Sequence, residues 1–445
     1  MKRPVVPAPA PWPFPEPRRT VLDNGLQVLS FHRPGQHLIN ATLVLDLPLN
    51  VESLGVEGIS SVLQRCLDEG TAAHPGTSFA DELEGSGAVL TGGSSHHAAH
   101  LSLEVPSTRI AAALPLLAEA VREPELGDDD VRRIVDLRLA EIAQQRAHPA
   151  QRGAMAFREA LIDPRFRAAR PAAGTAETVS TITPTDVRAH HRAHYGPQRG
   201  TLILAGDLAD DPLPLIDRAF GNWSADSEAS PGHETPAATR ARTVLIHRPA
   251  AVQADVRMGA FGLDRLDPRW PALRLGSFVL GGGFLSRLNR VLREQRGYTY
   301  GVQLSNAPAR HGGQLSLHAS FRTEVAAEAI VEARELVRTD GDRSITATEL
   351  TDAVNFLVGI TPLRCATAAG ITDQAATLVE VGLDAGYVNR HSASLLRVTP
   401  EQATEAVQQL LPPQGLTMVV VGDADALAEP LAAQGLAPEL VIDEH

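Results

Sequence analysis

The sequence predicts an α+β protein built from two homologous tandem domains. Strand and helix patterns come in mixed order, a block of sequence recurs in the second half, and a segment rich in Ser, Ala, Glu, Pro and Gly separates the halves. A doubly wound parallel sheet would instead show strict alternation of strands and helices. The predicted division is a Pro-rich N-terminal extension (1–18), a first domain (19–223), a linker (224–242) and a second domain (243–445).

The repeat is clearest where residues 182–207 align without gaps on residues 398–423. Both copies read as a Thr-Pro helix start, a helix, a Pro-Gln turn, an apolar strand and a closing Gly-Asp pair. Two shorter matches occur in the same order: His32-Arg33-Pro34 with His247-Arg248-Pro249, and residues 63–69 with 288–294. The two segments of the last match lie further apart in the sequence than those of the other matches, which implies an insertion in the second copy.

The first half is predicted to open with a hairpin and a strand. Asn24-Gly25 stands between apolar runs within residues 20–30, which is the strongest short signal for a β-hairpin. Residues 41–49 alternate like a strand. Apolar spacing then predicts helices over 59–67, 110–122 and 128–146. Three aspartates begin the last of these helices, where the helix dipole favours negative charge.

The segment 281–302 of the second half contains a glycine run followed by apolar residues at helical spacing. It predicts a Gly-rich turn, then a helix that ends at Gly297, and then a strand. The predicted apolar face of the helix consists of Leu285, Leu288, Val291 and Leu292.

Composition excludes several classes of protein. With 40 Lys and Arg against 53 Asp and Glu, the net charge of −13 argues against a nucleic-acid-binding protein that neutralises phosphates. No apolar run approaches the length of a membrane span, and two cysteines are too few for a disulfide framework or a thiolate zinc site. No apolar segment follows the first basic residues, so no secretory signal is expected and a cytoplasmic location is predicted.

Several motifs together resemble the pitrilysin/insulinase family of inverted zinc peptidases. They are the Asp-Asn-Gly-Leu hairpin at 23–26, Gly58 with Glu69-Gly70-Thr71, Tyr195 with Gly206-Asp207, and Gly281-Gly-Gly-Phe-Leu-Ser-Arg-Leu288. The resemblance covers nearly the whole chain. It implies tandem homologous domains, each a mixed, largely antiparallel β-sheet packed with α-helices.

Active members of that family carry His-x-x-Glu-His on the first helix and a further glutamate about 75 residues later. The corresponding positions here are Ser61, Gln64, Arg65 and Glu141. Serine is a poor zinc ligand, glutamine is no general base and arginine is a permanent cation. The resemblance therefore implies a degenerate zinc site that holds no metal. Arg65 is hypothesised to replace the charge of the metal and to form a buried pair with Glu141, the alternative being that both are solvated on their helices.

The resemblance also implies a second functional pair. Active assemblies of the family grip the peptide with an Arg and a Tyr seven residues apart, which match Arg293 and Tyr300 here. Arg293 would donate hydrogen bonds to a substrate carbonyl, and the Tyr300 hydroxyl would stabilise an oxyanion. Tyr298 is predicted to lie on the same strand and face as Tyr300 and to help line the substrate groove. The alternative is a solvated arginine and an ordinary packed tyrosine.

Together these features predict a catalytically silent, substrate-binding subunit of a heterodimeric zinc metalloendopeptidase. The resemblance implies that a homologous partner subunit bearing His-x-x-Glu-His holds the zinc, that this chain needs no cofactor of its own, and that the substrate is a peptide. The alternative is a non-enzymatic scaffold or binding protein of the same fold. Neither nucleic acid nor a membrane is expected as a partner.

Two further groups of residues are given no functional role. The histidines at 96, 97 and 100 and at 190, 191 and 194 lack carboxylates at a familiar ligand spacing, so packed or solvated histidines are predicted. The glycine pairs near 85–87 and 281–283 have no Walker lysine, and no Gly-x-Ser-x-Gly elbow is present. Nucleotide binding and serine hydrolysis are therefore not predicted.

Overall fold

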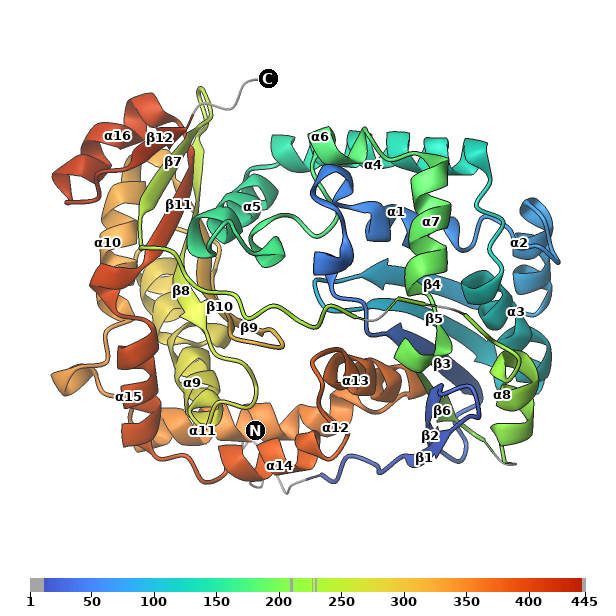
Figure 1. Ribbon diagram of the computed structural model, residues 1–445. Coiled ribbons are helices and arrows are strands. Elements are labelled where there is room, and N and C mark those ends of the chain that lie inside the picture. Colours follow the sequence, from blue (N-terminus) through green and yellow to red (C-terminus); the bar gives the residue numbers. More distant parts are fainter. Residues whose placement is uncertain (1–11, 209–210, 226, 229, 442–445) are drawn as a thin grey trace.

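The chain folds into two halves, each built on a six-stranded β-sheet with helices packed against it (Figure 1). The computed structural model describes residues 12–208, 211–225, 227–228 and 230–441. Strands of the first sheet come from residues 18–206 and strands of the second from residues 243–441. The α+β prediction is confirmed. Residues 1–11, most of the predicted Pro-rich extension, lie outside the described residues.

The two sheets have the same central strand order. The first sheet, β1-β2-β6-β3-β5-β4, consists of β1 (Arg18–Val21), β2 (Gln27–His32), β3 (Leu38–Leu45), β4 (Val89–Ser94), β5 (Ala99–Pro106) and β6 (Gly200–Gly206). The second sheet, β12-β7-β11-β8-β10-β9, consists of β7 (Thr243–His247), β8 (Gln253–Gly262), β9 (Val302–Pro308), β10 (Gly313–Arg322), β11 (Thr417–Gly422) and β12 (Glu439–Val441). The parallel pairs are β2 with β6, β7 with β11 and β7 with β12, and the other neighbouring strands are antiparallel. Both sheets are therefore mixed and largely antiparallel, as expected.

Helices fill the connections between strands. Those of the first half are α1 (Ile59–Cys66), α2 (Thr77–Gly85), α3 (Ile110–Arg122), α4 (Asp128–Ala147), α5 (Pro149–Leu161), α6 (Ala176–Val179), α7 (Pro184–His194) and α8 (Leu213–Phe220). Those of the second half are α9 (Trp270–Ser277), α10 (Ala326–Leu336), α11 (Ala347–Gly359), α12 (Thr361–Arg364), α13 (Ala368–Glu380), α14 (Tyr387–Leu395), α15 (Pro400–Leu410) and α16 (Ala424–Ala433). Two π-helical segments, Phe278–Gly282 and Asn289–Gln295, lie between α9 and β9.

Two of the three pairs of matching sequence segments occupy equivalent places in the two halves. The Thr-Pro pairs begin α7 and α15, and each threonine side chain caps its helix in a capping box. The His-Arg-Pro segments end β2 and β7, where His32 pairs with Gly206 and His247 pairs with Gly422 in parallel register. In both halves the arginine N–H donates to the glycine carbonyl at 2.7 Å. The sequence duplication is thus also a structural one.

The third predicted match, of residues 63–69 with residues 288–294, is wrong. Residues 63–69 belong to α1, which follows β3, and the chain enters α2 before it reaches β4. Residues 288–294 belong instead to the π-helical segment that directly precedes β9. The helix that follows β8, and therefore corresponds to α1, is α9. The sequences of the two segments are similar because both place leucines on a buried helical face.

The predicted elements of the first half are found with small differences. The hairpin is confirmed, with Val21 opposite Gln27 and Gly25 at a φ of +90°. The strand predicted over 41–49 begins earlier, at Leu38, and ends at Leu45, because Asp46 leaves the sheet to bind a distant side chain. The predicted helices correspond to α1, α3 and α4, each within one residue of its expected end.

One face of each sheet is covered by a helix that belongs to the other half of the chain. Helix α5 of the first half packs on β8 and β11, and α13 of the second half packs on β3 and β6 (Figure 1). Every residue of β6 and β11 is buried, as apolar strands enclosed on both faces should be. Phe157 of α5 lies in one apolar cluster with Val419 and Val421, and Ile371 of α13 lies in another with Phe31 and Ile203. The two halves therefore share their cores.

The described part of the N-terminal extension also contacts both halves. Phe14 is buried in the cluster of α13, with its ring 5.7 Å from that of Phe31. Its backbone N–H donates to Asn389 Oδ1 of α14 at 2.7 Å. The segment that begins at Trp12 is thus tied to the body of the protein.

No single helix in the described ranges is long and apolar enough to cross a membrane. Residues 341–364 and 368–380 meet the length and composition criteria only as a pair, bent by 116°. The second member of that pair is α13, whose apolar side chains pack against the first sheet.

A polar cluster joins the linker to both halves. The carboxylate of Asp46, just after β3, lies 2.6 Å from His233 Nε2 in the linker and 3.2 Å from Arg310 Nη1 in the turn between β9 and β10. The His97 ring lies beside that of His233, with ring centroids 5.8 Å apart and the planes tilted by 39°. Asp46 therefore holds three separate segments of the chain together.

We expect Asp46→Asn to lower stability at pH 7 and this deficit to shrink as the pH falls below about 4. Burial acts to raise the pKa of Asp46, but the hydrogen bond and charge of His233, with the charges of Arg310 and Arg199, lower it overall. A carboxylate with a lowered pKa stabilises the fold above its unfolded pKa and loses that contribution as it is protonated. The side chain is half exposed, so the deficit should be about 1 kcal/mol or less. Urea unfolding at pH 7 and pH 3.5 measures it, with the exposed Asp352→Asn as control. A deficit that is the same at both pH values would contradict the assignment.

Candidate functional site

Helix α1 carries three of the four degenerate zinc positions, Ser61, Gln64 and Arg65. It begins after Gly58, whose φ of +101° and close approach to the Ala173 backbone, 2.9 Å from a Cβ placed there, require glycine. The Glu52 carboxylate accepts hydrogen bonds from the N–H groups of Gly58 and Ser60 at 3.2 and 3.0 Å. These bonds satisfy donors that the first turn of a helix leaves unpaired and fix the direction of α1.

Arg65 and Glu141 form an ion pair, with Nη2 and Oε1 2.6 Å apart. A second arginine, Arg138 of α4, lies with its Nη1 3.2 Å from Glu141 Oε2. Burial acts to raise the pKa of Glu141, but the hydrogen bonds from both arginines lower it overall. The predicted pair is thus present, although the side chains of Arg65 and Glu141 are 40% and 37% exposed and not buried as expected. Arg138 was not predicted, yet its position three residues before Glu141 on one helix is a recognisable ion-pair spacing.

Gln64 is buried and donates a hydrogen bond from its amide nitrogen to the Tyr195 hydroxyl. Burial raises the pKa of Tyr195, so this hydroxyl stays protonated. The Gln64 Oε1 atom has no hydrogen-bond partner among the residues that the structure describes. Ser61 is half-buried beside it. The position of a general base is therefore occupied by a neutral amide engaged with a neutral phenol.

The residues present do not fit a zinc ion. Ser61 offers a hydroxyl, Gln64 offers no proton-accepting carboxylate, and Arg65 directs a permanent positive charge at Glu141. A divalent cation would have to displace the Arg65 guanidinium and would then lie beside Arg138. An arginine–carboxylate contact stands where a metal–carboxylate contact would be.

The second predicted site lies between α9 and β9, and its local structure differs from the prediction. The helix begins only after Leu285, which is exposed in the preceding turn, and it is π-helical over Asn289–Gln295. Gly281 is required by packing, since a Cβ there would lie 2.6 Å from the Leu304 Cβ of β9. Gly297 ends the helix at a φ of +63°, as predicted. Strand β9 begins at Val302, so Tyr298 and Tyr300 are in the loop before it and not on the strand.

Arg293 is held by neighbours of its own segment. Its guanidinium carbon lies 3.9 Å from the centre of the Phe284 ring, a cation–π contact. Its Nη2 is 2.7 Å from Glu294 Oε1, and Nε donates to the same oxygen at 2.8 Å. Nη1 makes no hydrogen bond to any described residue, so these donors remain available. Phe284 could not be found from the sequence, because no residue pattern marks an aromatic ring under an arginine.

The two tyrosines occupy different environments. Tyr300 is 96% exposed, whereas Tyr298 is half-buried against the core of the second half. A hydrogen bond to Glu328 of α10, with partial burial, raises the pKa of Tyr298. The prediction that Tyr298 shares a strand face with Tyr300 is therefore wrong, since Tyr298 is tied to α10. Arg293 and Tyr300 make no hydrogen bond with each other in this described segment.

The histidine groups are packed against protein partners. Burial lowers the pKa of His96 and of His190 to about 3, so both rings are neutral. His96 Nε2 lies 3.1 Å from the Arg170 carbonyl oxygen, and His190 Nε2 lies 3.1 Å from the Ser60 hydroxyl. His190 thereby supports the first turn of α1.

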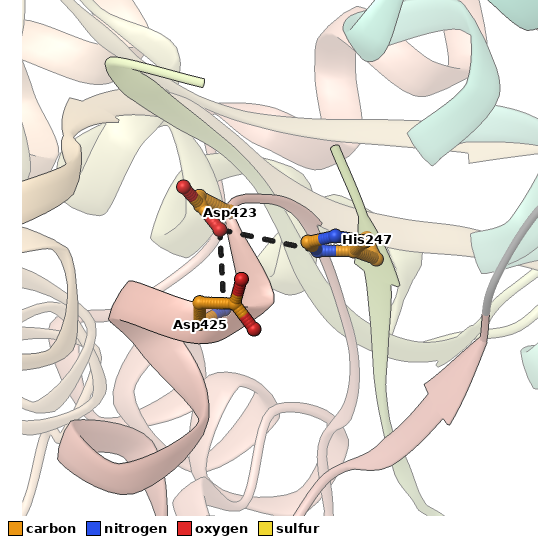
Figure 2. Close-up of side chains that lie close together, drawn as sticks. All are labelled: His247, Asp423 and Asp425. Atoms are coloured by element: carbon orange, nitrogen blue, oxygen red, sulfur yellow. Dashed lines mark hydrogen bonds and ion pairs between the residues drawn. The ribbon is translucent and has the colours of Figure 1, made fainter. Parts of the chain in front are cut away.

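Among the described residues, one group has metal-ligating atoms within 4.8 Å of one another: His247, Asp423 and Asp425 (Figure 2). Asp423 Oδ1 is 4.0 Å from His247 Nδ1 and accepts the backbone N–H of Asp425 at 3.1 Å. The same Nδ1 accepts the backbone N–H of Ala424 at 3.0 Å. These bonds cap the start of α16 and already use the ring nitrogen that faces the carboxylates.

The first half contains the equivalent arrangement. His32 Nδ1 is 3.9 Å from Asp207 Oδ1. The Asp207 carboxylate accepts the Gly35 N–H at 3.0 Å, just as Asp423 accepts the Ala250 N–H at 3.0 Å. A motif that closes a turn at the same strand end in both halves accounts for the cluster in Figure 2 without a metal.

Comparison with known protein families gives two matches that together span most of the chain. Residues 27–170 match the insulinase family, peptidase family M16. Residues 181–357 match the peptidase M16 inactive domain. The second match begins at the end of the first half and extends through α11 of the second half.

Relatives and solved structures extend this likeness over nearly the full length. An uncharacterized zinc protease of Mycobacterium bovis is 26% identical over 406 residues, covering 89% of this chain and 91% of that protein. A non-peptidase homolog of Helicobacter pylori is 25% identical over 313 residues, covering 69% of this chain and 71% of that protein. The crystal structure of a peptidase M16 inactive domain from Pseudomonas fluorescens superposes with a TM-score of 0.84 at 24% identity, covering 92% of this chain and 98% of that one.

Proposed function

The chain belongs to the insulinase family of peptidases, M16, and from this premise we propose that it is the catalytically silent, substrate-binding subunit of a two-chain zinc endopeptidase. One observation carries the proposal. The zinc position of the first half is filled by the Arg65–Glu141 ion pair, whereas the second half keeps Arg293 and an unobstructed Tyr300. A chain with no enzymatic role at all would have been free to lose both the zinc position and the Arg/Tyr pair.

The exposure of Tyr300 supports a site that is completed by another chain. A phenol hydroxyl stabilises an oxyanion effectively only where water is excluded, because water competes for the same hydrogen bond. Phe284 and Leu285 are exposed in the neighbouring turn, so three large side chains of this segment lack cover. A partner subunit with His-x-x-Glu-His would supply the metal, the attacking water and the missing wall.

Within such a pair, Arg293 and Tyr300 have separate tasks. Arg293 is prepositioned by Phe284 and Glu294, which leaves Nη1 to donate to a peptide carbonyl. Tyr300 would donate a hydrogen bond from its hydroxyl to the oxygen of the scissile carbonyl as negative charge develops there. Neither residue needs to change protonation state, so this chain contributes binding and charge stabilisation and no proton transfer.

The second candidate is a binding protein without any enzymatic role. It is favoured by the name of the Helicobacter pylori relative, a non-peptidase homolog, and by the engagement of Arg293 with its own Glu294. Both candidates require the same fold and the same degenerate zinc position. They differ in whether Arg293 and Tyr300 affect the turnover of a partner.

We expect Arg293→Ala and Tyr300→Phe each to lower the turnover of the reconstituted heterodimer by about 10- to 1000-fold, because each removes a donor to the reacting carbonyl. The assay mixes this chain with a homologous subunit that carries His-x-x-Glu-His and follows cleavage of a fluorogenic peptide library. Arg290→Ala is the matched control for Arg293, since it is exposed on the same π-helical segment, and Tyr298→Phe is the control for Tyr300.

Heterodimer formation is measured separately by analytical ultracentrifugation, so that loss of pairing is not mistaken for loss of catalysis. Unchanged turnover in both variants, with the heterodimer intact, would support the binding protein and refute donation in trans. Stoichiometric zinc bound by this chain alone would refute the silent-subunit proposal itself.

A further inference from the structure

A cavity of about 300 Å³ lies in the second half, enclosed by α9, the π-helical turn after it, β9, and helices α11 to α14. It is separate from the zinc position, which lies in the first half, and none of Phe284, Arg293 and Tyr300 lines it. Its size is at the lower end of the range for small-molecule sites.

Three arginines line this cavity and no acidic residue does. They are Arg265 before α9, Arg274 within α9 and Arg364 at the end of α12. Arg274 is largely enclosed, and the positive charges of Arg265 and Arg364 act on it. The carboxylate that acts on Arg265 belongs to Glu380, which lies outside the cavity lining and accepts a hydrogen bond from Ser95 of the first half. Enclosed arginines are ordinarily paired. Arg265 and Arg274 are at least partly enclosed, yet neither forms an ion pair with a described carboxylate.

Several N–H donors of these three arginines have no hydrogen-bond partner among the described residues. Arg265 Nε is buried and has no hydrogen-bond partner among the described residues. Arg364 donates no side-chain hydrogen bond to any described residue. Arg274 Nη1 donates to His391 Nε2 at 2.7 Å, which uses one of its five N–H groups. Unsatisfied buried donors are costly, and an oxyanion is the ligand that satisfies several of them together.

The remaining wall is mixed, with polar side chains such as Asn306, Gln374 and Thr377 beside a set of apolar ones. Phe278, Leu304 and Leu357 face the same space from the π-helical turn, β9 and α11. A fully hydrated inorganic ion would gain nothing from this side, whereas an aliphatic or aromatic group would bury its surface there. The cavity wall thus contains both arginine donors and apolar side chains.

We propose that this cavity binds a small organic anion, whose carboxylate or phosphate group is held by Arg265, Arg274 and Arg364 and whose apolar part packs on Phe278, Leu304 and Leu357. The inference stands apart from the proposed peptidase role, since it uses none of the residues of that role. A ligand bound there would also join α9, β9, α11 and α12, and so would stiffen the second half.

The charge of the site is constant around neutral pH. The titratable groups that face the cavity are its three arginines, Cys365, Tyr387 and His391. Burial, with the charges of Arg274 and Arg265, lowers the pKa of His391 to about 3, so its ring stays neutral and accepts from Arg274. Burial lowers the pKa of Arg274 to about 10, which still leaves it charged, and burial raises the pKa values of Cys365 and Tyr387. Anion affinity should therefore depend little on pH between 6 and 8.

The test is isothermal titration of the full chain with phenyl phosphate, benzoate, inorganic phosphate and neutral benzyl alcohol. We expect saturable binding of about one phenyl phosphate or benzoate per chain, at least about tenfold weaker binding of inorganic phosphate, and no binding of the alcohol. The relative affinities of phenyl phosphate and benzoate also show which anionic group the site prefers. Benzoate affinity should change less than about twofold from pH 6 to pH 8.

Arg364→Gln and Arg265→Gln should each weaken binding by about tenfold or more. Arg364 is exposed at the edge of the cavity, so its variant is expected to fold normally. Arg322→Gln, which removes an exposed arginine outside the cavity, is the matched control and should bind as the wild type does. The proposal is overturned if neither phenyl phosphate nor benzoate binds, or if both variants bind as tightly as the control. Inorganic phosphate bound as tightly as phenyl phosphate would refute the role of the apolar wall.

Discussion

Replacing Arg167 with methionine should lower the free energy of unfolding by about 3–5 kcal/mol, because it leaves a buried carboxylate without its counter-charge. The side chains of Arg167 and Glu52 are 4% and 0% exposed. The guanidinium donates from Nη2 and Nε to Glu52 Oε2 at 2.8 and 3.1 Å. It also donates to the carbonyl oxygens of Arg170, Pro171 and Ala172, so the substitution deprives a whole loop of its hydrogen bonds.

Glu52 makes this loss unusually consequential, since the same carboxylate caps α1. Oε2 accepts from both Arg167 and the N–H of Gly58, and Oε1 accepts from Ser60. A structure that relaxes to hydrate or protonate Glu52 therefore also frees the start of α1. Urea unfolding at pH 7 measures the effect, and thermal unfolding should show a lower midpoint.

Arg165→Met is the matched control, because Arg165 makes its ion pair with Asp163 at the surface, with its side chain 80% exposed. Its effect should be within about 0.5 kcal/mol of zero. Adding Glu52→Gln to Arg167→Met should recover part of the loss, since an amide oxygen still accepts from the α1 backbone without a buried charge. Equal stabilities of the Arg167→Met and Arg165→Met proteins would show that the Glu52 pair contributes nothing.

The triple substitution Ser61→His, Gln64→Glu and Arg65→His should create a zinc site in a chain whose own residues do not fit one. Histidines at positions i and i+4 share a helix face, as two zinc ligands on one helix must. The 2.6 Å contact between Arg65 and Glu141 shows that the Glu141 carboxylate reaches this face of α1. Removing the guanidinium both frees Glu141 and eliminates a positive charge from the site.

After dialysis against a weak chelator, elemental analysis should find about one zinc per chain in the triple variant and only traces in the wild type. Adding Glu141→Gln should weaken zinc binding by at least about tenfold, because a carboxylate ligand becomes a neutral amide. Adding Arg138→Gln should strengthen it, since Arg138 also binds Glu141. A folded triple variant that binds no more zinc than the wild type would mean that Ser61, Arg65 and Glu141 do not occupy the ligand positions of the family.

The sequence predicted best those features that a few neighbouring residues specify. Asn24-Gly25 specifies a hairpin, and Thr183 caps the helix that Pro184 begins, so both elements were found at the expected residues. The Arg65–Glu141 pair was predictable because its two positions follow from one motif spacing. Its partial exposure was not, since burial depends on what neighbouring elements cover.

Features that depend on distant segments could not be predicted. The strand over 41–49 ends early because Asp46 binds His233 and Arg310, which no local pattern indicates. The loop at Tyr298 and Tyr300 read as a strand because its aromatic residues favour strands, whereas Tyr298 is held by α10. The anion cavity is lined by residues of several separate segments, so the sequence shows only scattered arginines.

The exchange of α5 and α13 between the halves bears on how such a chain could arise. The two helices hold corresponding places in the order of elements. Helix α5 follows hairpin β4–β5 and helices α3 and α4, and α13 follows hairpin β9–β10, helices α10 and α11 and the short α12. Each covers the sheet of the opposite half, which is the geometry of a domain-swapped dimer within one polypeptide (Figure 1). A single-copy ancestor would have paired with a second copy of itself to cover its open sheet. With both halves in one chain, the mutual covering of the sheets does not depend on protein concentration.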